Sequence, residues 1–363
     1  MPRVGNPIVV APTVKPMNQL ISVCAMTAVV VVAAFASTGV GAEAAARPYQ
    51  AQPVEAPKNA PYVLRDGSIY IVGNDGMKEI LEKFNELFEK THPGFKITMK
   101  LEGSSTGIGG LTAGVSALAP MGREAWPTDV SGFREQYGYE PFAVRIGYDG
   151  FGPRPKLKNP PAIYVNAKNP LAGLTTAQLT RIFTTGAPEG DITHWSQLDV
   201  GGEWAMRAIH IYGPRDDGGL ATSLRYMHMS RLPFARRYEP LPKGVDIVQA
   251  VANDRYGIAL APFIDAAAVS ANVKLLPLAR KAGEAFSDAS YESVAAGRYP
   301  LSPYLYIYVN RVPKQPFDPF VKEYLRMALS QEGQAIIASQ KDSDEGFVPL
   351  SPSDLALERA KLE

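Results

Sequence analysis

A strand-like run, a polar turn containing glycine and a helical pattern follow one another three times in this chain, and this order limits the folds it can adopt. The three turns are Gly73–Gly76, Gly103–Gly107 and Gly213–Gly219. In a parallel sheet covered by helices, such turns follow the carboxyl ends of the strands and lie at one edge. The sequence therefore predicts an α/β fold in which side chains from different turns can face one ligand.

The first unit joins a strand predicted over 68–72 to a helix predicted over 77–90. Between them lie Asn74, Asp75 and Gly76, and asparagine or aspartate there can cap the helix. The helix is predicted because apolar side chains recur on one helical face, with charged residues on the opposite face. The apolar residues are Met77, Ile80, Leu81, Phe84, Leu87 and Phe88. Further along the chain, a single helical stretch is predicted over 317–339, and Thr175 is predicted to cap another helix.

The second unit begins with a strand predicted over 95–101, where apolar and polar residues alternate. It contains the glycine-rich stretch Leu101–Gly110, which precedes a short helix predicted from Leu111. Ser104, Ser105 and Thr106 would lie beside the unpaired N–H groups of that helix start, and such a place binds anions. The alternative is a polar cap before an ordinary helix. The stretch lacks the third glycine of a dinucleotide fingerprint and the Gly-Lys-Ser/Thr of a P-loop.

Two arginines are candidates for contact with an anion, and Arg123 is expected near the same edge of the sheet. Arg123 follows the next predicted strand, and Arg215 opens the turn that ends in Gly218 and Gly219. A guanidinium group can donate two hydrogen bonds to one oxyanion. The alternatives are an ordinary surface position for Arg123 and, for Arg215, an ion pair with one of the two aspartates that follow it.

Residues 1–44 are predicted to be an export signal. Arg3 and Lys15 precede an apolar run over Leu20–Phe35, and small residues suited to cleavage follow that run. The alternative is an uncleaved membrane anchor, since a span needs about 20 apolar residues. Cys24 is the only cysteine, and its place within the run argues against a lipid anchor. Cleavage would leave a mature protein without a disulfide.

The segment 45–66 is rich in alanine and proline, and it is predicted to be a flexible linker. Without residues 1–44, 35 basic and 35 acidic residues remain. This balance gives no indication of a nucleic acid or an anionic membrane as partner. The remaining chain of about 320 residues is long enough for two domains.

Motifs for metal binding and for nucleophilic catalysis are missing from the sequence. The histidines do not stand at the spacing of a metal motif such as HExxH, and a G-x-S-x-G elbow is absent. The four histidines are His92, His194, His210 and His228. We therefore expect neither a metal nor a cofactor.

Several motifs in a fixed order make the chain, from about Gly67 to its end, similar to the periplasmic phosphate-binding proteins of phosphate ABC transporters. They are the loop Gly103–Gly107, Gly122-Arg123, Gly147-Tyr-Asp-Gly150, Asn169-Pro-Leu171, Gly213-Pro-Arg-Asp-Asp-Gly218, Tyr306–Asn310 and Gly346–Pro352. Each motif is weak alone, and their order and spacing carry the resemblance.

The resemblance implies a type 2 periplasmic binding fold with two lobes, a hinge and a ligand cleft between the lobes. The first lobe would comprise 67–150 and, after the chain returns, 301–363, which ends in a helix; the second lobe would comprise 151–300. A member of this family is a periplasmic or secreted monomer that captures inorganic phosphate and passes it to an ABC permease, and it is not an enzyme. By position, Ser104 and its neighbours match the family's serine loop, and Arg215 matches its binding arginine.

The chain also departs from the family pattern at three places. Asn74-Asp75 replaces a threonine or serine, Asp217-Gly-Gly-Leu-Ala221 lacks two hydroxyls, and an aspartate that usually follows the second loop is here Gly122 or Arg123. Asp75 is therefore interpreted either as a helix cap or as a substitute acceptor for the proton of phosphate, which would exclude sulfate.

These departures leave three alternative functions open. The first is the binding of another oxyanion or of a small phosphate ester. The second is a secreted hydrolase in which Arg123 and Arg215 hold a phosphate ester and Asp75 attacks it. The third is a structural or adhesive protein that keeps the fold without binding a ligand.

Overall fold

The computed structural model describes residues 47–55, 59–154, 156–262 and 270–363. All of them belong to one compact unit. The predicted export signal, Cys24 and the first two residues of the predicted linker lie outside the described residues. Within those residues, no helix combines the length and the apolar character that crossing a membrane requires.

The first lobe contains two sheets whose strands lie side by side. Strands β1 and β2 pair in parallel, while a second, antiparallel sheet has the order β13-β4-β12-β3. Backbone hydrogen bonds from Asn74 N to Pro120 O (2.9 Å) and from Ala117 N to Tyr70 O (2.9 Å) connect β1 with the β3 segment. The strands are β1 (Ile69–Gly73), β2 (Ile97–Leu101), β3 (Ala119–Met121), β4 (Phe142–Tyr148), β12 (Tyr304–Val309) and β13 (Val348–Pro349).

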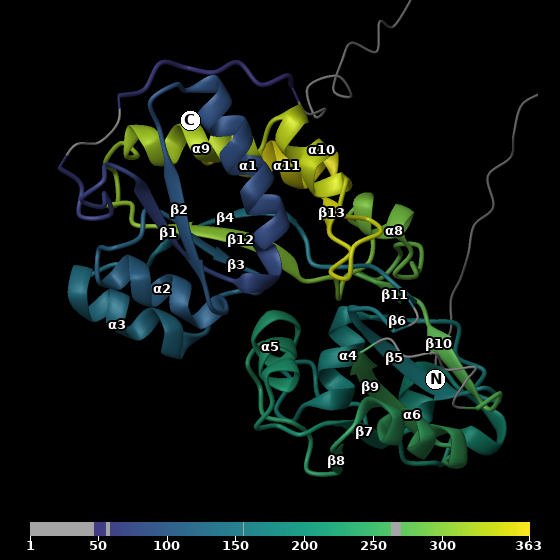
Figure 1. Ribbon diagram of the computed structural model, residues 1–363. Helices are drawn as coiled ribbons and strands as arrows, with labels where there is room; N and C mark the ends of the chain where they lie inside the picture. Colours follow the sequence, from purple (N-terminus) through teal and green to yellow (C-terminus); the bar gives the residue numbers. More distant parts are fainter. Residues whose placement is uncertain (1–46, 56–58, 155, 263–269) are drawn as a thin grey trace, which may run out of the picture. The chain divides into compact units, whose positions relative to one another are not determined.

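Helices from both ends of the described chain cover these sheets (Figure 1). The helix predicted after the first turn is confirmed as α1, and its buried side chains include Ile80, Leu81, Phe84 and Phe88. It packs against α9 and α10. The helices are η1 (Asp75–Met77), α1 (Lys78–Thr91), α2 (Ser104–Thr112), α3 (Pro127–Tyr137), α8 (Tyr291–Ala295), α9 (Pro319–Ala328), α10 (Gln331–Ala338) and α11 (Pro352–Ala360).

Two helix predictions were wrong in their bounds. The single helical stretch predicted over 317–339 is interrupted, because Ser330 Oγ donates to Met327 O and accepts from Gly333 N, which ends α9 and caps α10. Helix α2 begins at Ser104 rather than at Leu111, after Gly103 with φ 116°, a backbone conformation that favours glycine. The hydroxyl residues therefore form the first turn of α2.

The second lobe is built on a five-stranded sheet with the order β10-β5-β9-β7-β8. Strand β7 runs parallel to β8 and β9, and β5 runs antiparallel to β9 and β10. Thr175 caps α4 as predicted, accepting from Gln178 N at 3.2 Å. The elements are β5 (Pro161–Asn166), β6 (Leu174–Thr175), α4 (Thr176–Phe183), η2 (Trp195–Leu198), η3 (Gly202–Trp204), β7 (His210–Pro214), α5 (Gly219–His228), β8 (Tyr238–Leu241), α6 (Gly244–Asn253), β9 (Gly257–Pro262), β10 (Val273–Leu276) and β11 (Leu278–Ala279).

The chain passes between the lobes twice. It leaves the first lobe after β4 through residues 149–160 and returns before β12, which lies between β4 and β3 (Figure 1). Because β12 pairs with strands that precede the second lobe in the sequence, the first lobe is assembled from two distant parts of the chain.

Part of the predicted flexible linker is attached to the first lobe. Glu323, which is 3% exposed, accepts hydrogen bonds from Tyr49 Oη (2.8 Å) and Gln52 N (2.9 Å). Tyr49 N donates to Glu332, and His92 Nε2 lies 3.0 Å from Gln52 O. Residues 47–52 are thus fixed on α1, α9 and α10, because buried polar groups of the lobe use them as hydrogen-bond partners.

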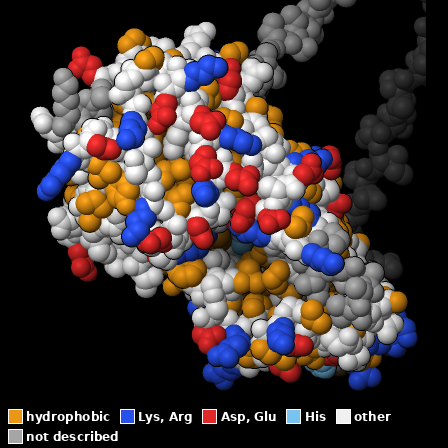
Figure 2. Space-filling view, in the orientation of Figure 1, with side chains coloured by type: hydrophobic (Ala, Val, Ile, Leu, Met, Phe, Trp, Pro, Cys, Tyr) orange, Lys and Arg blue, Asp and Glu red, His pale blue; other side chains and the backbone are white. Residues whose placement is uncertain are grey.

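Figure 2 shows the surface of one face, on which acidic and basic side chains lie interspersed over the first lobe. This mixture agrees with the balance of charges in the sequence.

Candidate functional site

Ser104 contacts the residues that directly follow β1 and β3. Ser104 Oγ accepts hydrogen bonds from Asn74 Nδ2 (2.9 Å) and from Gly122 N (3.2 Å). Asn74 and Ser104 therefore lie together, as expected for turns that follow neighbouring parallel strands at one edge of a sheet. Because Ser104 begins α2, the first unpaired N–H groups of that helix lie at the same place.

Arg123 lies beside this cluster and is held rigidly. It forms an ion pair with Asp129 (Nη1–Oδ2 2.6 Å, Nη2–Oδ1 3.3 Å), and its Nη2 donates to Ser105 Oγ at 2.9 Å. Its guanidinium carbon lies 3.7 Å from the centre of the Trp126 ring. Only 16% of the Arg123 side chain and 7% of the Asp129 side chain are exposed. A guanidinium group fixed in this way is oriented before any ligand arrives.

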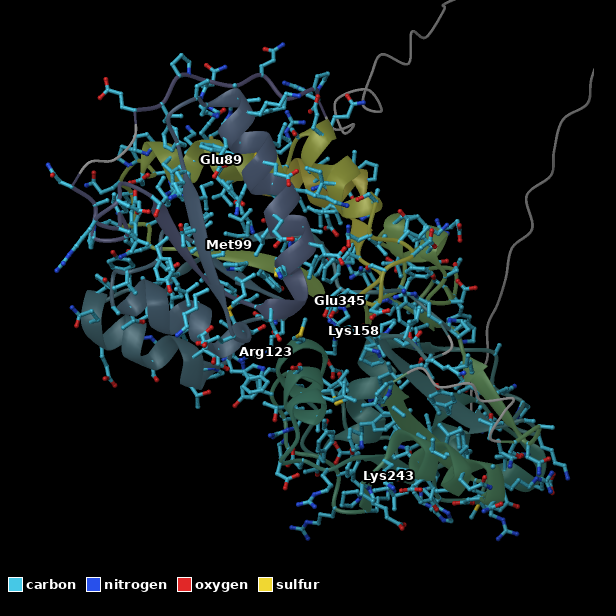
Figure 3. The ribbon with its side chains drawn as sticks, in the orientation of Figure 1. Glu89, Met99, Arg123, Lys158, Lys243 and Glu345 are labelled. Carbon is cyan, nitrogen blue, oxygen red and sulfur yellow. The ribbon has the colours of Figure 1, made fainter. Side chains whose placement is uncertain are left out.

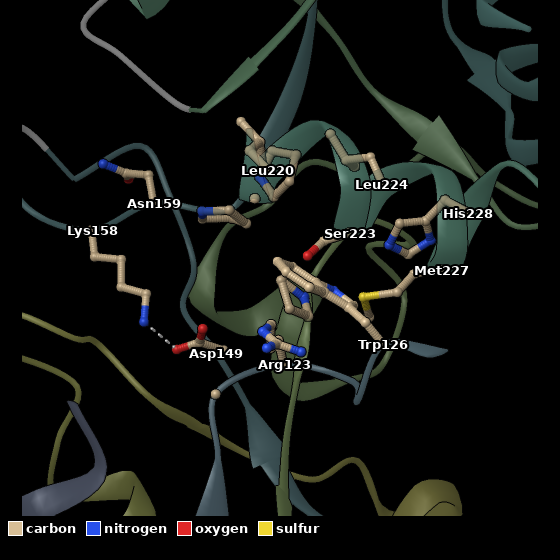
Figure 4. A pocket seen from close by; sticks show the side chains of 15 residues that line it. Arg123, Trp126, Asp149, Lys158, Asn159, Leu220, Ser223, Leu224, Met227 and His228 are labelled. Atoms are coloured by element: carbon tan, nitrogen blue, oxygen red, sulfur yellow. Dashed lines mark hydrogen bonds and ion pairs between the residues drawn. The ribbon is translucent and has the colours of Figure 1, made fainter. Parts of the chain in front are cut away.

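A cavity of about 290 Å³ lies where the two lobes meet. Arg123 and Trp126 of the first lobe, Asp149 and Lys158 of the first passage between lobes, and α5 of the second lobe all contribute to its lining. Figure 3 places Arg123, Lys158 and Glu345 in this region, and Figure 4 shows the lining side chains from close by.

A carboxylate is buried at the edge of this cavity. Asp149 is 6% exposed, and its Oδ1 accepts from Lys158 Nζ at 2.8 Å. Lys158 also pairs with Glu345 at 2.6 Å. Burial raises the pKa of Asp149, and the ammonium group of Lys158 opposes this. A β-carbon at Gly122 would lie 3.7 Å from Asp149 Oδ2 and 3.7 Å from Asn74 Nδ2, so Gly122 separates the buried carboxylate from the Asn74–Ser104 cluster.

The second lobe presents the start of α5 to the cavity. The cap residue Gly218 supplies no side-chain hydrogen bond, and Gly219 and Leu220 belong to the lining. The unpaired N–H groups of the first turn are therefore free of side-chain caps within the described residues. A β-carbon at Gly219 would lie 3.6 Å from the Trp126 ring, so α5 begins next to that indole.

Arg215 forms an ion pair with a neighbouring aspartate, which was the alternative expected for it from the sequence. It pairs with Asp217 (Nη2–Oδ2 2.6 Å, Nε–Oδ1 3.1 Å), and both side chains are 65% exposed. It is not among the cavity-lining residues. The guanidinium group of Arg215 lowers the pKa of Asp217, so this pair stays ionised near neutral pH.

His228, at the other end of α5, also lines the cavity. Burial, together with the positive charge of Arg280, lowers the pKa of His228 to about 4. The imidazole is therefore neutral at pH 7 and adds no positive charge to the site.

The ten residues predicted for the site fall into three groups. Asn74, Ser104, Ser105 and Arg123 form one hydrogen-bonded cluster, and Gly219 lies opposite Arg123 in the cavity lining. Only Arg123 and Gly219 of the ten are among the lining residues, so Asn74, Ser104 and Ser105 lie beside the cavity rather than in its lining. The remaining five belong to neither group: Asp75 and Arg215 are exposed, Gly76 lies against Glu345, Thr106 Oγ1 donates to Gly103 O, and Gly218 caps α5.

The lining residues that were not predicted from the sequence include Trp126, Asp149, Lys158 and Ser223. Asp149 follows β4 directly, and the rule that singled out the other strand ends could have found it. The remaining three come to the cavity only because the two lobes meet there, which no local pattern indicates. In the described ranges, no cluster of three or more histidine, cysteine or acidic side chains is arranged to hold a metal ion.

Comparisons with known proteins agree with this architecture. The model of the PBP superfamily domain matches residues 64–332. The phosphate-binding protein PstS of Pseudomonas aeruginosa is 29% identical to this chain over 287 residues, which cover 78% of this chain and 83% of that protein. Protein SphX of Synechococcus elongatus is 25% identical over 284 residues, or 77% of this chain and 76% of that protein. The solved structure of PstS from Borrelia burgdorferi has a TM-score of 0.50 and 18% identity, covering 78% of this chain and 98% of that one.

The resemblance inferred from motif order is thereby confirmed, and so is a two-lobed α/β fold. The matched domain extends from the start of the first lobe through the second lobe and back into α10. The chain belongs to the periplasmic binding protein (PBP) superfamily.

Proposed function

We propose that this protein is an extracytoplasmic solute-binding protein that captures inorganic phosphate for an ABC transporter. The observation that carries the proposal is the interlobe cavity, which has Arg123 on one side and the uncapped start of α5 on the other. The name of the Pseudomonas aeruginosa relative, a phosphate-binding protein, supports the same ligand. The predicted export signal, and the equal numbers of basic and acidic residues after residue 44, fit a monomer that carries its ligand to a membrane permease.

The donors around the cavity suit an oxyanion. The first turn of α5 lies in the cavity lining and offers backbone N–H groups, and the first turn of α2 lies next to the lining residue Gly122. Helix starts of this kind favour negative charge. Ser105 and Arg123 add a hydroxyl and a fixed guanidinium group from the first lobe. Arg215 would reach the ligand when the lobes close, by exchanging part of its contact with Asp217 for the anion.

A binding role is favoured over hydrolysis by the position of the candidate nucleophile. Asp75 is exposed and does not line the cavity, whereas Arg123 does. An attacking group must lie within reach of the phosphorus atom, so Asp75 and Arg123 do not form the arrangement that a hydrolase would need.

Isothermal titration calorimetry with inorganic phosphate tests the proposal. The wild-type protein should bind phosphate, and Arg123→Lys should bind it at least ~10-fold more weakly, because lysine keeps the charge but lacks the planar guanidinium group that contacts Asp129 and Ser105 and is thereby oriented at the cavity. Arg134→Lys is the matched control, since Arg134 pairs with Glu140 on the surface of the same lobe. Absence of phosphate binding by the wild type, or equal losses in both variants, would overturn the proposed function.

A further inference from the structure

We propose that the cavity also accepts phosphoryl oxyanions that carry one small apolar substituent, and that it binds them more tightly than inorganic phosphate. This class comprises small organic phosphonates and phosphate monoesters. The inference rests on the proposed function, since the phosphoryl group would occupy the oxyanion site between Arg123 and the start of α5.

One wall of the cavity, formed by α5, is mainly apolar, with Ser223 and His228 as its polar members. Leu220, Leu224 and Met227 lie at the i, i+4 and i+7 positions of α5, so they share one face, and all three line the cavity. Trp126 of the first lobe belongs to the same lining (Figure 4). Leu224 is only 2% exposed, which shows that this wall is continuous with the core of the second lobe.

The first turn of α5 offers no side-chain donor to a ligand. Gly219, Leu220 and Ala221 carry only hydrogen or hydrocarbon side chains, and Ser223 supplies the one hydroxyl of α5 among the lining residues. A phosphate oxygen facing Leu220 and Leu224 would lose its hydrogen bonds to water without replacement. A carbon substituent in the same place loses none, and it gains free energy by leaving water.

The cavity also has room for a substituent. Its volume of about 290 Å³ equals roughly ten water molecules at ~30 Å³ each. The five non-hydrogen atoms of inorganic phosphate are joined by covalent bonds, so the ion is smaller than five separate water molecules and would leave at least about half of this space free. The part left over borders the apolar wall.

Trp126 is fixed as part of that wall. Its ring stacks on Arg123 at 3.7 Å and lies close to Gly219, so it is held from both lobes. Its indole Nε1 is buried and has no hydrogen-bond partner among the described residues. Buried donors of this kind need an acceptor, and an oxygen of the bound phosphoryl group can supply one.

Competition and calorimetric titrations with four ligands test the inference: inorganic phosphate, methylphosphonate, phenylphosphonate and phenyl phosphate. Burial of each methylene-sized group should strengthen binding about fourfold. Phenylphosphonate or phenyl phosphate should therefore bind at least ~10-fold more tightly than inorganic phosphate. If phenylphosphonate binds more tightly than phenyl phosphate, phosphonates are the preferred class of ligand. The opposite order identifies phosphate monoesters.

Leu220→Ser places a hydroxyl in the first turn of α5 and removes part of the apolar wall. It should abolish the preference for the phenyl ligands and strengthen the binding of inorganic phosphate. Leu220 is partly exposed, so the fold should tolerate the change, which circular dichroism melting would verify. Leu357→Ser is the matched control, because Leu357 lies on α11 and is 59% exposed. This variant should keep the wild-type preference.

The possible outcomes separate this inference from the proposed function. If inorganic phosphate binds as tightly as the substituted ligands, or more tightly, the inference is wrong and the proposed function stands. If the phenyl preference survives Leu220→Ser, the substituent lies elsewhere and the inference is also wrong. If no ligand binds the wild-type protein, the proposed function itself fails.

Discussion

Asp149→Asn should change the choice between phosphate and sulfate. Phosphate keeps a proton near neutral pH and sulfate does not, and an ionised carboxylate can only accept a hydrogen bond. Asp149 is the buried carboxylate at the cavity, with Oδ1 on Lys158 and Oδ2 on the side of Gly122. We therefore expect Asp149, rather than Asp75, to accept the proton of bound phosphate and to repel sulfate.

The size of the effect follows from the contacts of Asp149. A hydrogen bond to a charged group contributes ~1.5–3 kcal/mol, so the variant should bind phosphate roughly 10- to 150-fold more weakly. Sulfate, which the wild type should exclude, should bind the variant with an affinity within about tenfold of that for phosphate. The fold should persist, because the amide has the same shape and Lys158 keeps its second carboxylate, Glu345, at 2.6 Å.

Calorimetric titration of both anions at pH 7 measures these changes. Glu345→Gln is the matched control, since it removes the other carboxylate of Lys158 while Glu345 does not line the cavity. The control should keep the wild-type exclusion of sulfate. The reasoning fails if Asp149→Asn still excludes sulfate with unchanged phosphate affinity, or if Glu345→Gln admits sulfate equally well.

Three further predictions follow from the positions of the other charged groups. Asp75→Asn should leave phosphate affinity and sulfate exclusion unchanged in the same titrations, because Asp75 is exposed outside the cavity lining; gain of sulfate binding would restore its role as discriminator. Arg215→Ala should weaken phosphate binding about 10-fold, the low end for a charged hydrogen bond, because Arg215 must also release Asp217; an unchanged dissociation constant would show that Arg215 stays on Asp217. In denaturant titrations, the contribution of His228 to the free energy of unfolding should be constant above pH ~6.5 and should fall by up to about 3 kcal/mol as the pH is lowered to about 4. The reason is that His228 stays neutral in the folded protein, whereas its imidazole takes up a proton in the unfolded chain. The figure is an upper bound, since His228 is partly exposed, and a decline of the same size in His228→Asn would assign it to other groups.

Strands and the first helix could be predicted because their patterns are local. The alternation before Leu101 and the apolar face from Met77 to Phe88 both reflect burial on one side of a single element. The start of α2 was missed because Gly103 allows the backbone to turn immediately, so that three hydroxyl residues enter the helix. The break before α10 was missed because one serine serves both the end of α9 and the start of α10.

Among the residues of the candidate site, those of the first lobe were mostly the ones placed correctly from the sequence, and Gly219 is the lining residue that was selected from the second lobe. Asn74, Ser104 and Arg123 come together through the order of strands in the first lobe, which the sequence indicates. Trp126 and Lys158 line the cavity only because of how the two lobes meet, and the periodicity of a helix or strand carries no information about that contact.

The position of β12 has a consequence for the order in which the chain can fold during synthesis. Tyr306 pairs with Met121 on one side and Arg145 on the other, so the strand that joins β3 to β4 emerges from the ribosome after the whole second lobe. Contacts so distant in sequence form late and slowly, because a long loop must close first. The second lobe can complete its own five-stranded sheet earlier, since β5 to β10 lie within residues 161–276. A nascent chain of this design keeps the central sheet of its first lobe open until residue 309 has been made, a delay that would give an export pathway time to engage it before that lobe closes.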